Sequence, residues 1–520
     1  MKKTLLLFIV MFFALRQNAQ TQNNTSITAR IDSLVPIVMN DWKIPGMAVA
    51  VIKNNDVIFK KGFGTKSPEE FLPVDENTVF QIGSVSKSFT AALIAMLVDE
   101  GKLNWHDKII DHLPDFRMYD SLATKSMQIR DIMTHRSGLR GQAGTYIPNM
   151  GYDRDDIYSL LKYIKPSTEL RSTYAYNNIT FIIAAKLIEK YTGKSWEENV
   201  SERIFKPLGM TNSSMNEDGF LNSENRSMSC EFEYDNGIKN KWLYDDDRAL
   251  FWLTVIGPAG SINSTATDLI KWSKFHLNKG KVDGKEIISE KNMKYLHTGQ
   301  IITSMDSARI TVYGHCWFIE QTNRYRLYFH TGTTWGFTTL CAFIPEIDLG
   351  VVILANSESP EGPRYTIMRN IIDWFMFGKA EKDYHAEMFG KFINEAEEET
   401  KKKNEKEKDK IIESFPHDTW TYNSFADIYH NEILGDAVIK VENEKLFITI
   451  GKQRWTSELQ HVDGLSKFEF RMQGHAFPLE FLFDCDAVSG FKVDFGYGEI
   501  SENWTKANTP PCGKSPDKEK

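Results

Sequence analysis

Strand-forming stretches lie at both ends of the segment from Met47 to Ala355, and helical patterns fill its middle. Two β-type runs near the beginning, separated by a turn of Asn and Asp residues, predict a hairpin over Met47–Lys53 and Val57–Phe63. Between about Leu103 and Leu296, apolar residues recur mainly at helical spacing. Strand patterns then return, at Tyr325–Phe329, Phe337–Ile344 and Leu349–Ala355. This order predicts an α/β fold in which one sheet is assembled from both ends and carries an inserted helical lobe.

The chain is long enough for more than one domain. Its 520 residues, with 41% hydrophobic and 12% aromatic content, can fill a packed core and exclude global disorder. The segment from Glu381 to Ile412 mixes both signs of charge, as a solvated helix or linker does, whereas short alternating runs after Phe425 indicate a small β-domain. We predict a signal peptide at 1–20, a main domain at 25–380, a charged helical linker at 381–415, a small β-domain at 416–508 and a disordered tail at 509–520.

The first residues have the pattern of an export signal. Two lysines are followed by an apolar run over Leu5–Leu15 and by a small, polar stretch over Asn18–Gln20. A run of this length is too short to span a bilayer as a stable helix, although retention as a membrane anchor is the alternative. We therefore expect an exported protein, periplasmic or secreted, with no stable membrane span after signal removal.

Composition excludes several classes of function. The formal net charge of −8 provides no basic surface for polyanions, so nucleic acid is not an expected partner. The five cysteines form no C-x-x-C pair, which argues against a dense disulfide framework or a Cys-type zinc site but leaves room for one or two disulfides. The 12 histidines lack metalloprotease spacing, and the Gly-x-Ser-x-Gly elbow and phosphate-binding loops are absent. We predict no metal and no other cofactor.

A serine and a lysine three residues apart carry the candidate chemistry. Ser84 and Lys87 open an apolar helical pattern, and Gly101 stands where a helix C-cap belongs. Three residues of separation at a helix start place both side chains on one face, where free backbone N–H groups favour a developing alkoxide. Because a free serine hydroxyl is a poor nucleophile, the chemistry needs a base, and a lysine whose pKa is lowered by burial can supply it.

The same spacing occurs elsewhere, so the pair alone is weak. The other pairs are Ser159 with Lys162, Ser489 with Lys492 and Ser515 with Lys518. They fall in a helix-like run, in the late β-domain and in the tail, whereas Ser84 follows a glycine at a helix start. The structural alternative for Ser84 is a helix N-cap with Lys87 exposed.

The residues around Ser84 resemble a known family. Phe80-Gln-Ile-Gly-Ser84-Val-Ser-Lys87-Ser-Phe is similar to the active-site helix of class C β-lactamases and related penicillin-recognising hydrolases. Tyr176-Asn177-Asn178, which precedes the apolar run Ile179–Ile188, resembles the Tyr-x-Asn element of that family. The resemblance implies that Tyr176 exchanges protons with Ser84 and the leaving group, and that Asn178 orients Lys87 and the substrate amide.

The Tyr-x-Asn element is weak by itself. Similar triplets begin at Tyr234 and Tyr429, and the structural alternative for Tyr176 is a half-buried loop aromatic with a bonded hydroxyl.

A third family element is a strand that carries Lys-Thr-Gly or a variant. His330-Thr331-Gly332 matches the His-x-Gly variant and follows a β-type run, whereas the similar triplet at His297 ends a helix-like run. The resemblance implies that His330, Thr331 and Gly332 line the substrate site. It also implies that the Thr333 N–H joins the Ser84 N–H in an oxyanion hole. The structural alternative for His330 is an ordinary polar residue at a strand end.

The resemblance covers roughly Ile27 to Gly378 and implies a β-lactamase/transpeptidase-like fold, in which helices flank an antiparallel sheet. Three further runs resemble structural boxes of the family, namely Thr134–Leu139, Ile204–Met210 and Gly257–Ser261. Beyond them, Phe425–Trp504 resembles the accessory β-barrel-type domain fused to such hydrolases. Asp427 stands where the usual opening of that domain has glycine.

The resemblance implies a serine hydrolase that forms an acyl-enzyme with an amide or ester of a small molecule or short peptide. β-Lactamases and D-Ala-D-Ala carboxypeptidases usually carry Lys at the position of His330. The His-x-Gly form is instead similar to D-aminopeptidases and some esterases, so peptidase or esterase activity is favoured over those two activities. Protonation of His330 below about pH 6.5 is expected to favour substrates that carry a carboxylate.

An alternative from another class is a non-catalytic sensor of penicillin or cell-wall fragments. Decayed enzymes generally lose a nucleophile or base, and here Ser84, Lys87 and Tyr176 are all present, which disfavours this alternative.

Overall fold

The computed structural model describes residues 24–245, 247–408, 415–416, 420–452, 454–472, 475–484, 487–495 and 503–506. These residues form two compact units, each assembled from separate stretches of the chain. The first unit lies within residues 1–102, 194–244 and 260–405, and the second lies within 103–193, 245–259 and 406–520. The predicted signal peptide at 1–20 and the predicted tail at 509–520 lie outside the described residues.

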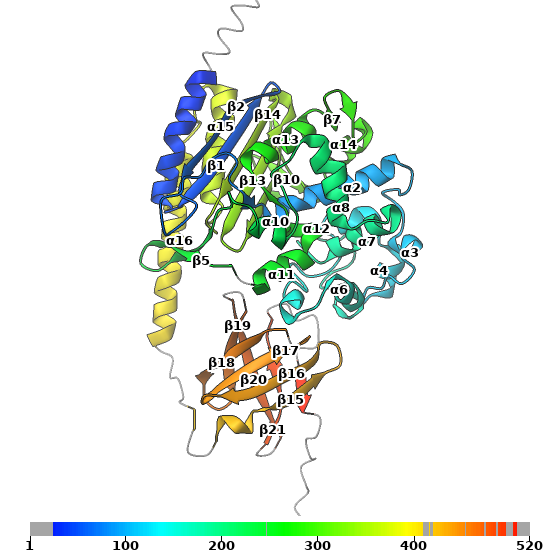
Figure 1. Ribbon diagram of the computed structural model, residues 1–520, viewed down its shortest axis with the longest axis vertical. Coiled ribbons are helices and arrows are strands. Elements are labelled where there is room, and N and C mark those ends of the chain that lie inside the picture. The colour runs from blue at the N-terminus through cyan, green and yellow to red at the C-terminus, as the bar shows by residue number, and fades with distance from the viewer. Residues whose placement is uncertain are drawn as a thin grey trace, which may run out of the picture. The chain divides into compact units, whose positions relative to one another are not determined.

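An eight-stranded antiparallel sheet forms the centre of the first unit (Figure 1). Its strands are, in spatial order, β2 (Asp56–Gly64), β1 (Gly46–Lys53), β14 (Leu349–Ala355), β13 (Phe337–Ile344), β12 (Arg326–Thr334), β11 (Phe318–Gln321), β10 (Ile310–Tyr313) and β9 (Ile301–Met305). The N-terminal hairpin joins the later strands through β1, where Met47 lies opposite Ala355. The predicted assembly of one sheet from both ends of the segment is therefore confirmed.

Helices cover both faces of this sheet. The helix at residues 24–41 and α15 (Gly362–Phe377) pack on one face, where Val49, Ile353 and Ile371 belong to one buried cluster. On the other face, α13 (Ala266–Leu277) packs against β1, β13 and β14, and α14 (Glu290–Leu296) packs against α2 (Ser86–Asp99). Because both faces are covered, β1 is an uninterrupted buried apolar run rather than an alternating one.

The remaining elements of the first unit are short, apart from the charged helix α16 (Tyr384–Lys408). They are β3 (Phe80–Gln81), η1 (Gly83–Val85), α8 (Trp196–Val200), η4 (Ser201–Phe205), α9 (Lys206–Leu208), α10 (Glu217–Leu221), β4 (Ser229–Tyr234), β5 (Ile238–Leu243), β6 (Asn263–Ser264), β7 (Lys281–Val282), β8 (Lys285–Glu286) and η5 (Pro345–Ile347). In the described part of the chain, no helix combines the length and the apolar character needed to cross a bilayer.

The second unit contains the helical lobe that the sequence places between the strands. Its helices are α3 (Ile109–His112), α4 (Ser121–Ser126), α5 (Ile129–Ile132), η2 (Ile147–Met150), α6 (Arg154–Leu160), η3 (Leu161–Tyr163), α7 (Thr180–Thr192) and α11 (Asp247–Val255). A further short helix, α12 (Gly257–Gly260), runs to the sequence boundary between the units. The longest of the lobe helices, α7, ends at Gly193, whose φ of +69° is the left-handed conformation typical of a helix C-terminus.

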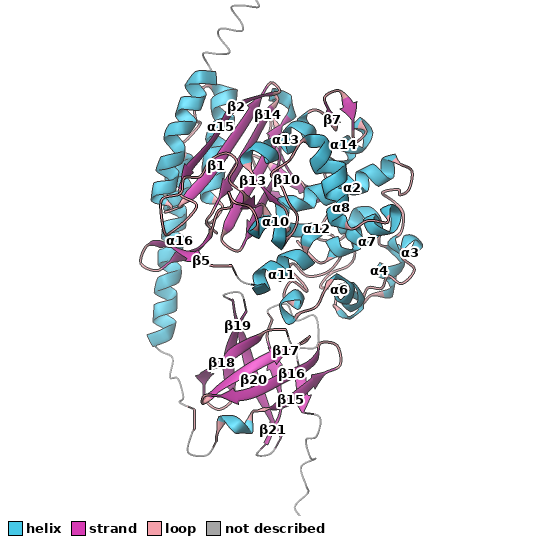
Figure 2. Ribbon diagram, viewed as in Figure 1, coloured by secondary structure: helices cyan, strands magenta, loops and turns pink. Residues whose placement is uncertain are grey.

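A closed antiparallel barrel forms the C-terminal part of the second unit (Figure 2). After the short helix η6 (Tyr422–Ser424), its strands are β15 (Asp427–Asn431), β16 (Gly435–Glu442), β17 (Lys445–Ile450), β18 (Thr456–Asp463), β19 (Lys467–Met472), β20 (His475–Asp484), β21 (Ala487–Val493) and β22 (Asn503–Lys506). Alternate side chains of its strands point into the barrel. In β19, Phe468, Phe470 and Met472 are buried, while the residues between them are more exposed. The predicted small β-domain is confirmed as a barrel.

Candidate active site

Ser84 lies in a tight turn that leads directly into α2. The turn η1 ends where α2 begins, and neither element is capped by a side chain. Ser84 is therefore not the helix cap of the structural alternative. It is partly exposed, whereas its neighbours from Phe80 to Thr90 are buried. Ser84 is thus partly accessible to solvent within a segment that is otherwise buried.

Lys87 lies beneath Ser84 as a fully buried amine. Its Nζ donates a hydrogen bond to Ser84 Oγ at 3.0 Å. The side chain is 0% exposed, and burial lowers the pKa of Lys87 to about 7, an effect that the nearby thiol of Cys316 opposes. Desolvation penalises the ammonium form, so a substantial fraction of the amine is neutral at neutral pH. A neutral amine in contact with the hydroxyl can accept its proton.

Two glycines let the Ser84 turn and strand β12 approach each other closely. Gly83 has a φ of +50°, and a Cβ there would lie 2.8 Å from the Thr333 nitrogen. A Cβ on Gly332 would lie 1.9 Å from the Ile82 carbonyl oxygen and 3.2 Å from the Ser84 nitrogen. The backbone nitrogens of Ser84 and Thr333 therefore lie where the Ser84 turn and β12 touch each other. An oxyanion hole needs two backbone N–H groups placed close together in this way.

Strand β12 presents an open edge to the Ser84 turn. Among the described strands, β11 pairs with Arg326–Phe329, while β13 pairs with β12 as far as Thr334. After Phe329, β12 no longer pairs with β11 on the side that faces away from β13. The turn η1 packs against β12. The β-type run read at Tyr325–Phe329 is longer in the structure, because pairing with β13 extends β12 to Thr334. His330, Thr331 and Gly332 therefore lie on the strand, as the resemblance implies. Strand β12 is an inner strand of the sheet, between β13 and β11.

His330 is buried, and both of its ring nitrogens have partners within the protein. Its Nδ1 donates to the Thr331 carbonyl oxygen at 2.6 Å, and Tyr313 Oη donates to its Nε2 at 2.9 Å. Burial, reinforced by the charge of Lys87, lowers the pKa of His330 to about 3. The expectation that His330 protonates below about pH 6.5 is therefore wrong, since an imidazolium ion at this position would be desolvated.

A neutral His330 leads to a prediction about pH dependence. The ratio of kcat/KM for a substrate with a carboxylate to kcat/KM for its neutral analogue should stay constant between about pH 5 and 8, because the imidazole remains neutral above its depressed pKa. Taking the ratio removes the titration of Lys87, which affects both substrates equally. Steady-state kinetics on a matched pair, such as an acidic and a neutral ester, would check this. A ratio that rises as the pH falls through 6.5 would contradict it.

The side chain of Thr331 points away from Ser84. Successive residues of a strand point to opposite faces, and His330 occupies the Lys87 side. Thr331 instead lines a cavity of about 740 Å³ together with Phe329 and Tyr365. We therefore expect Thr331 to act on substrate through its backbone.

Tyr176 and Asn178 belong to the second unit, in the loop that precedes α7. Gln142 holds both, because its N–H donates to the Tyr176 carbonyl at 2.7 Å and its Oε1 accepts from Asn178 Nδ2 at 3.1 Å. His135 lies with its ring 4.1 Å from the Tyr176 ring, and its Nδ1 accepts the Asn177 N–H at 3.1 Å. The loop is thus well anchored within its unit, while its convergence with Ser84 stays a prediction.

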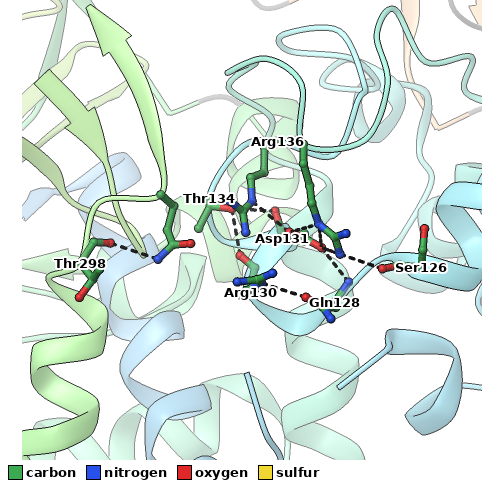
Figure 3. Close-up of polar contacts among 9 residues, drawn as sticks. Ser126, Gln128, Arg130, Asp131, Thr134, Arg136 and Thr298 are labelled. Atoms are coloured by element: carbon green, nitrogen blue, oxygen red, sulfur yellow. Dashed lines mark hydrogen bonds and ion pairs between the residues drawn. The ribbon is translucent and has the colours of Figure 1, made fainter. Parts of the chain in front are cut away.

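A buried carboxylate ties this loop to the preceding segment (Figure 3). Asp131 is 0% exposed and accepts from Arg136 Nε at 3.0 Å. It also accepts from Arg171 Nη2 at 2.6 Å. The Arg171 N–H also donates to the Arg136 carbonyl at 2.8 Å. Two cations satisfy the charge that Asp131 would otherwise bury unpaired. The Thr134–Leu139 run therefore has a structural role in holding the loop.

Competing sites within the described residues are not supported by the geometry. The hydroxyl of Ser159 donates to the Asp155 carbonyl at 2.9 Å within α6, and that of Ser489 donates to the Leu482 carbonyl at 3.1 Å in the barrel. Ser515 lies outside the described residues. No three His, Cys, Asp or Glu side chains of the described residues come close enough to hold a metal ion.

A known protein family matches a large part of this chain. The model of the Beta-lactamase family matches residues 31–372, which is more than half of the 520-residue chain. The chain belongs to the β-lactamase family. An unguisins hydrolase of Aspergillus campestris is 28% identical over 347 residues, which are 62% of this chain and 60% of that protein. Protein flp of Staphylococcus aureus is 24% identical over 341 residues, which are 64% of each chain. The match thus spans less than two thirds of each of these relatives.

Solved structures share the fold of this β-lactamase-family chain. An octameric penicillin-binding protein homologue from Pyrococcus abyssi has a TM-score of 0.59 and 21% identity, and the match covers 92% of this chain and 99% of that one. A class C β-lactamase mutant has a TM-score of 0.54 and 22% identity, with 67% and 98% covered. The fold implied by the resemblance is confirmed.

Sequence reasoning about this family member missed the residues that support the site. Tyr313 donates to His330 from another strand, and Arg364 donates to the Gly332 carbonyl from α15. The ring of His135 packs against the Tyr176 ring, and the His135 backbone has a left-handed φ of +54°. Tyr313 and Arg364 belong to no recognised motif and act on motif residues from distant parts of the chain, so no local signal marks them. His135 lies inside the recognised Thr134–Leu139 run, so the sequence contained a signal that could have identified it as a supporting residue.

Proposed function

We propose that this β-lactamase-family chain is a serine hydrolase that forms an acyl-enzyme with amide or ester substrates, acting as a peptidase or an esterase. One observation carries the proposal, namely the 3.0 Å hydrogen bond from the buried amine of Lys87 to the partly exposed hydroxyl of Ser84. A lysine with a pKa near neutrality is suited to accept the proton of a nucleophile, whereas an ordinary surface lysine is not.

The proposed reaction has two steps. Neutral Lys87 takes the proton as Ser84 Oγ attacks the carbonyl carbon, and the N–H groups of Ser84 and Thr333 bind the oxyanion. Tyr176 then passes a proton to the leaving amine or alcohol, which departs and leaves the acyl group on Ser84. In the second step water attacks the acyl group and gives its proton to the Tyr176 phenolate, while the Lys87 ammonium returns a proton to Ser84 Oγ as the acyl bond breaks.

The neutral state of His330 supports the choice of substrate class. A site for a substrate carboxylate normally offers a cation, but both nitrogens of His330 are occupied by Thr331 and Tyr313, and its pKa is far below neutrality. Neutral amides and esters meet no unfavourable charge there. This favours peptidase or esterase activity over β-lactamase or D-Ala-D-Ala carboxypeptidase activity.

Activity-based labelling combined with a substrate panel tests the proposal. The wild-type chain should take up a fluorophosphonate on the peptide that contains Ser84, and it should hydrolyse short-chain esters or D- or L-amino-acid amides faster than a chromogenic β-lactam. The absence of both label and turnover would refute it. Faster hydrolysis of the β-lactam would indicate a β-lactamase, and acylation without turnover would indicate a sensor.

A further inference from the structure

Arg364 is a buried cation on the face of the sheet opposite α13. It lies on α15, is 2% exposed, and its Nη1 donates to the Gly332 carbonyl at 2.9 Å and to the Thr339 carbonyl at 3.0 Å. Gly332 and Thr339 are opposite each other on β12 and β13. Arg364 thus binds backbone carbonyls at the part of β12 that meets the Ser84 turn.

No ion pair accounts for this guanidinium. Within the described residues, no carboxylate lies within 4.0 Å of Arg364, and its buried Nε has no hydrogen-bond partner. Burial lowers the pKa of Arg364, yet an arginine stays protonated in proteins. Five residues further along the helix, Arg369 is paired with Glu320 through two hydrogen bonds of 2.7 and 2.6 Å. The charge of Glu361, one turn before Arg364, opposes the effect of burial, but it makes no ion pair with Arg364. A buried cation without a contacting counter-ion is costly, so we look for a role beyond stability.

The peptide that Arg364 holds is also the peptide that faces the nucleophile. The carbonyl of Gly332 and the N–H of Thr333 belong to one planar trans peptide group, so they point in opposite directions. The Thr333 nitrogen lies 2.8 Å from the position of a Cβ on Gly83, beside Ser84. The carbonyl end of the same group receives the Arg364 hydrogen bond. A cation at the carbonyl end polarises the peptide and makes its N–H a stronger donor.

We propose that Arg364 is a positioning residue that polarises the Gly332–Thr333 peptide and strengthens the oxyanion hole of the hydrolase. This inference rests on the proposed acyl-enzyme function. Loss of the charge should lower kcat by roughly ten- to a hundredfold, less than the hundred- to thousandfold loss typical of removing a whole oxyanion donor. KM should change little, because the effect is greatest on the negatively charged transition state.

The test uses two substitutions of Arg364 in the full-length chain and a stable fluorophosphonate adduct on Ser84. Arg364→Gln removes the charge but keeps an amide donor, whereas Arg364→Lys keeps the charge. The P=O stretching frequency of the adduct reports hydrogen bonding in the oxyanion hole, since it falls as the bonds to the phosphonyl oxygen strengthen. We expect the frequency to rise in Arg364→Gln together with the loss in kcat, and to stay near the wild-type value in Arg364→Lys.

Arg369→Gln is the matched control. It disrupts the buried pair with Glu320 on the same helix but does not touch the Gly332–Thr333 peptide, so it should lower thermal stability without moving the P=O band. An unmoved band and unchanged kcat in Arg364→Gln, or an equal shift in Arg369→Gln, would overturn the inference. If Arg364→Gln does not fold, a folded Arg364→Lys that shifts the band would overturn it as well. A wild-type chain that takes up no phosphonyl group would refute both the proposed function and this inference, whereas a labelled wild type with an insensitive band refutes the inference alone.

Discussion

Ser84→Ala is expected to abolish both fluorophosphonate labelling and turnover. The substitution removes the one oxygen that can form the acyl bond, and loss of a nucleophile that acts together with its base costs on the order of a millionfold in kcat. Because the residue is partly exposed and caps no helix, the fold should be unaffected. The measurement is kcat for the best ester or amide of the panel, together with gel detection of the bound probe.

Ser159→Ala provides the matched control for this substitution. Ser159 has the same spacing to a lysine, but its hydroxyl is exposed and bonded to the Asp155 carbonyl within α6. It should keep full labelling and turnover. Retention of label or activity by a folded Ser84→Ala protein would place the nucleophile elsewhere and end the assignment.

The sequence predicted the parts of the fold whose signals are local. Strands β1, β13 and β14 appear as apolar runs, because helices bury both faces of the central strands. The turn residues between β1 and β2 indicate the hairpin. The end of β12 does not appear as an apolar run, since His330-Thr331-Gly332-Thr333 is polar for a strand. Its extended backbone depends on pairing with β13 and on the Arg364 hydrogen bond, which are long-range contacts. The short strands β9 to β11 were also missed, although β9 and β10 are rich in β-branched residues.

The candidate site shows the same division between local and long-range information. Three residues of separation at a helix start were enough to predict that Lys87 reaches Ser84, and the two side chains are hydrogen-bonded. The protonation of His330 could not be predicted, because its pKa depends on burial and on Lys87, more than two hundred residues earlier in the sequence. Tyr313, which donates to His330, lies on β10, so no spacing rule connects them.

Lys87→Met is expected to lower kcat/KM by about a hundred- to ten-thousandfold, the range typical of losing a general base. Methionine has a similar length and no charge to desolvate, so the buried position should accept it without loss of thermal stability. The control is Lys162→Met, at the exposed lysine of the Ser159 pair, which should leave kcat/KM unchanged. A folded Lys87→Met protein with wild-type kcat/KM would exclude Lys87 as the base.

The pH profile of the wild-type chain provides a sharper form of the same prediction. The reactive form is the neutral amine, which predominates above the pKa, so kcat/KM for a neutral ester should rise with pH and level off above an apparent pKa near 7. His330 cannot produce this rise, because its pKa of about 3 lies well below the range. The rise should disappear in Lys87→Met, whose residual activity has lost the titrating amine. A profile that falls with increasing pH, or a rise that persists in Lys87→Met, would show that another group is the base.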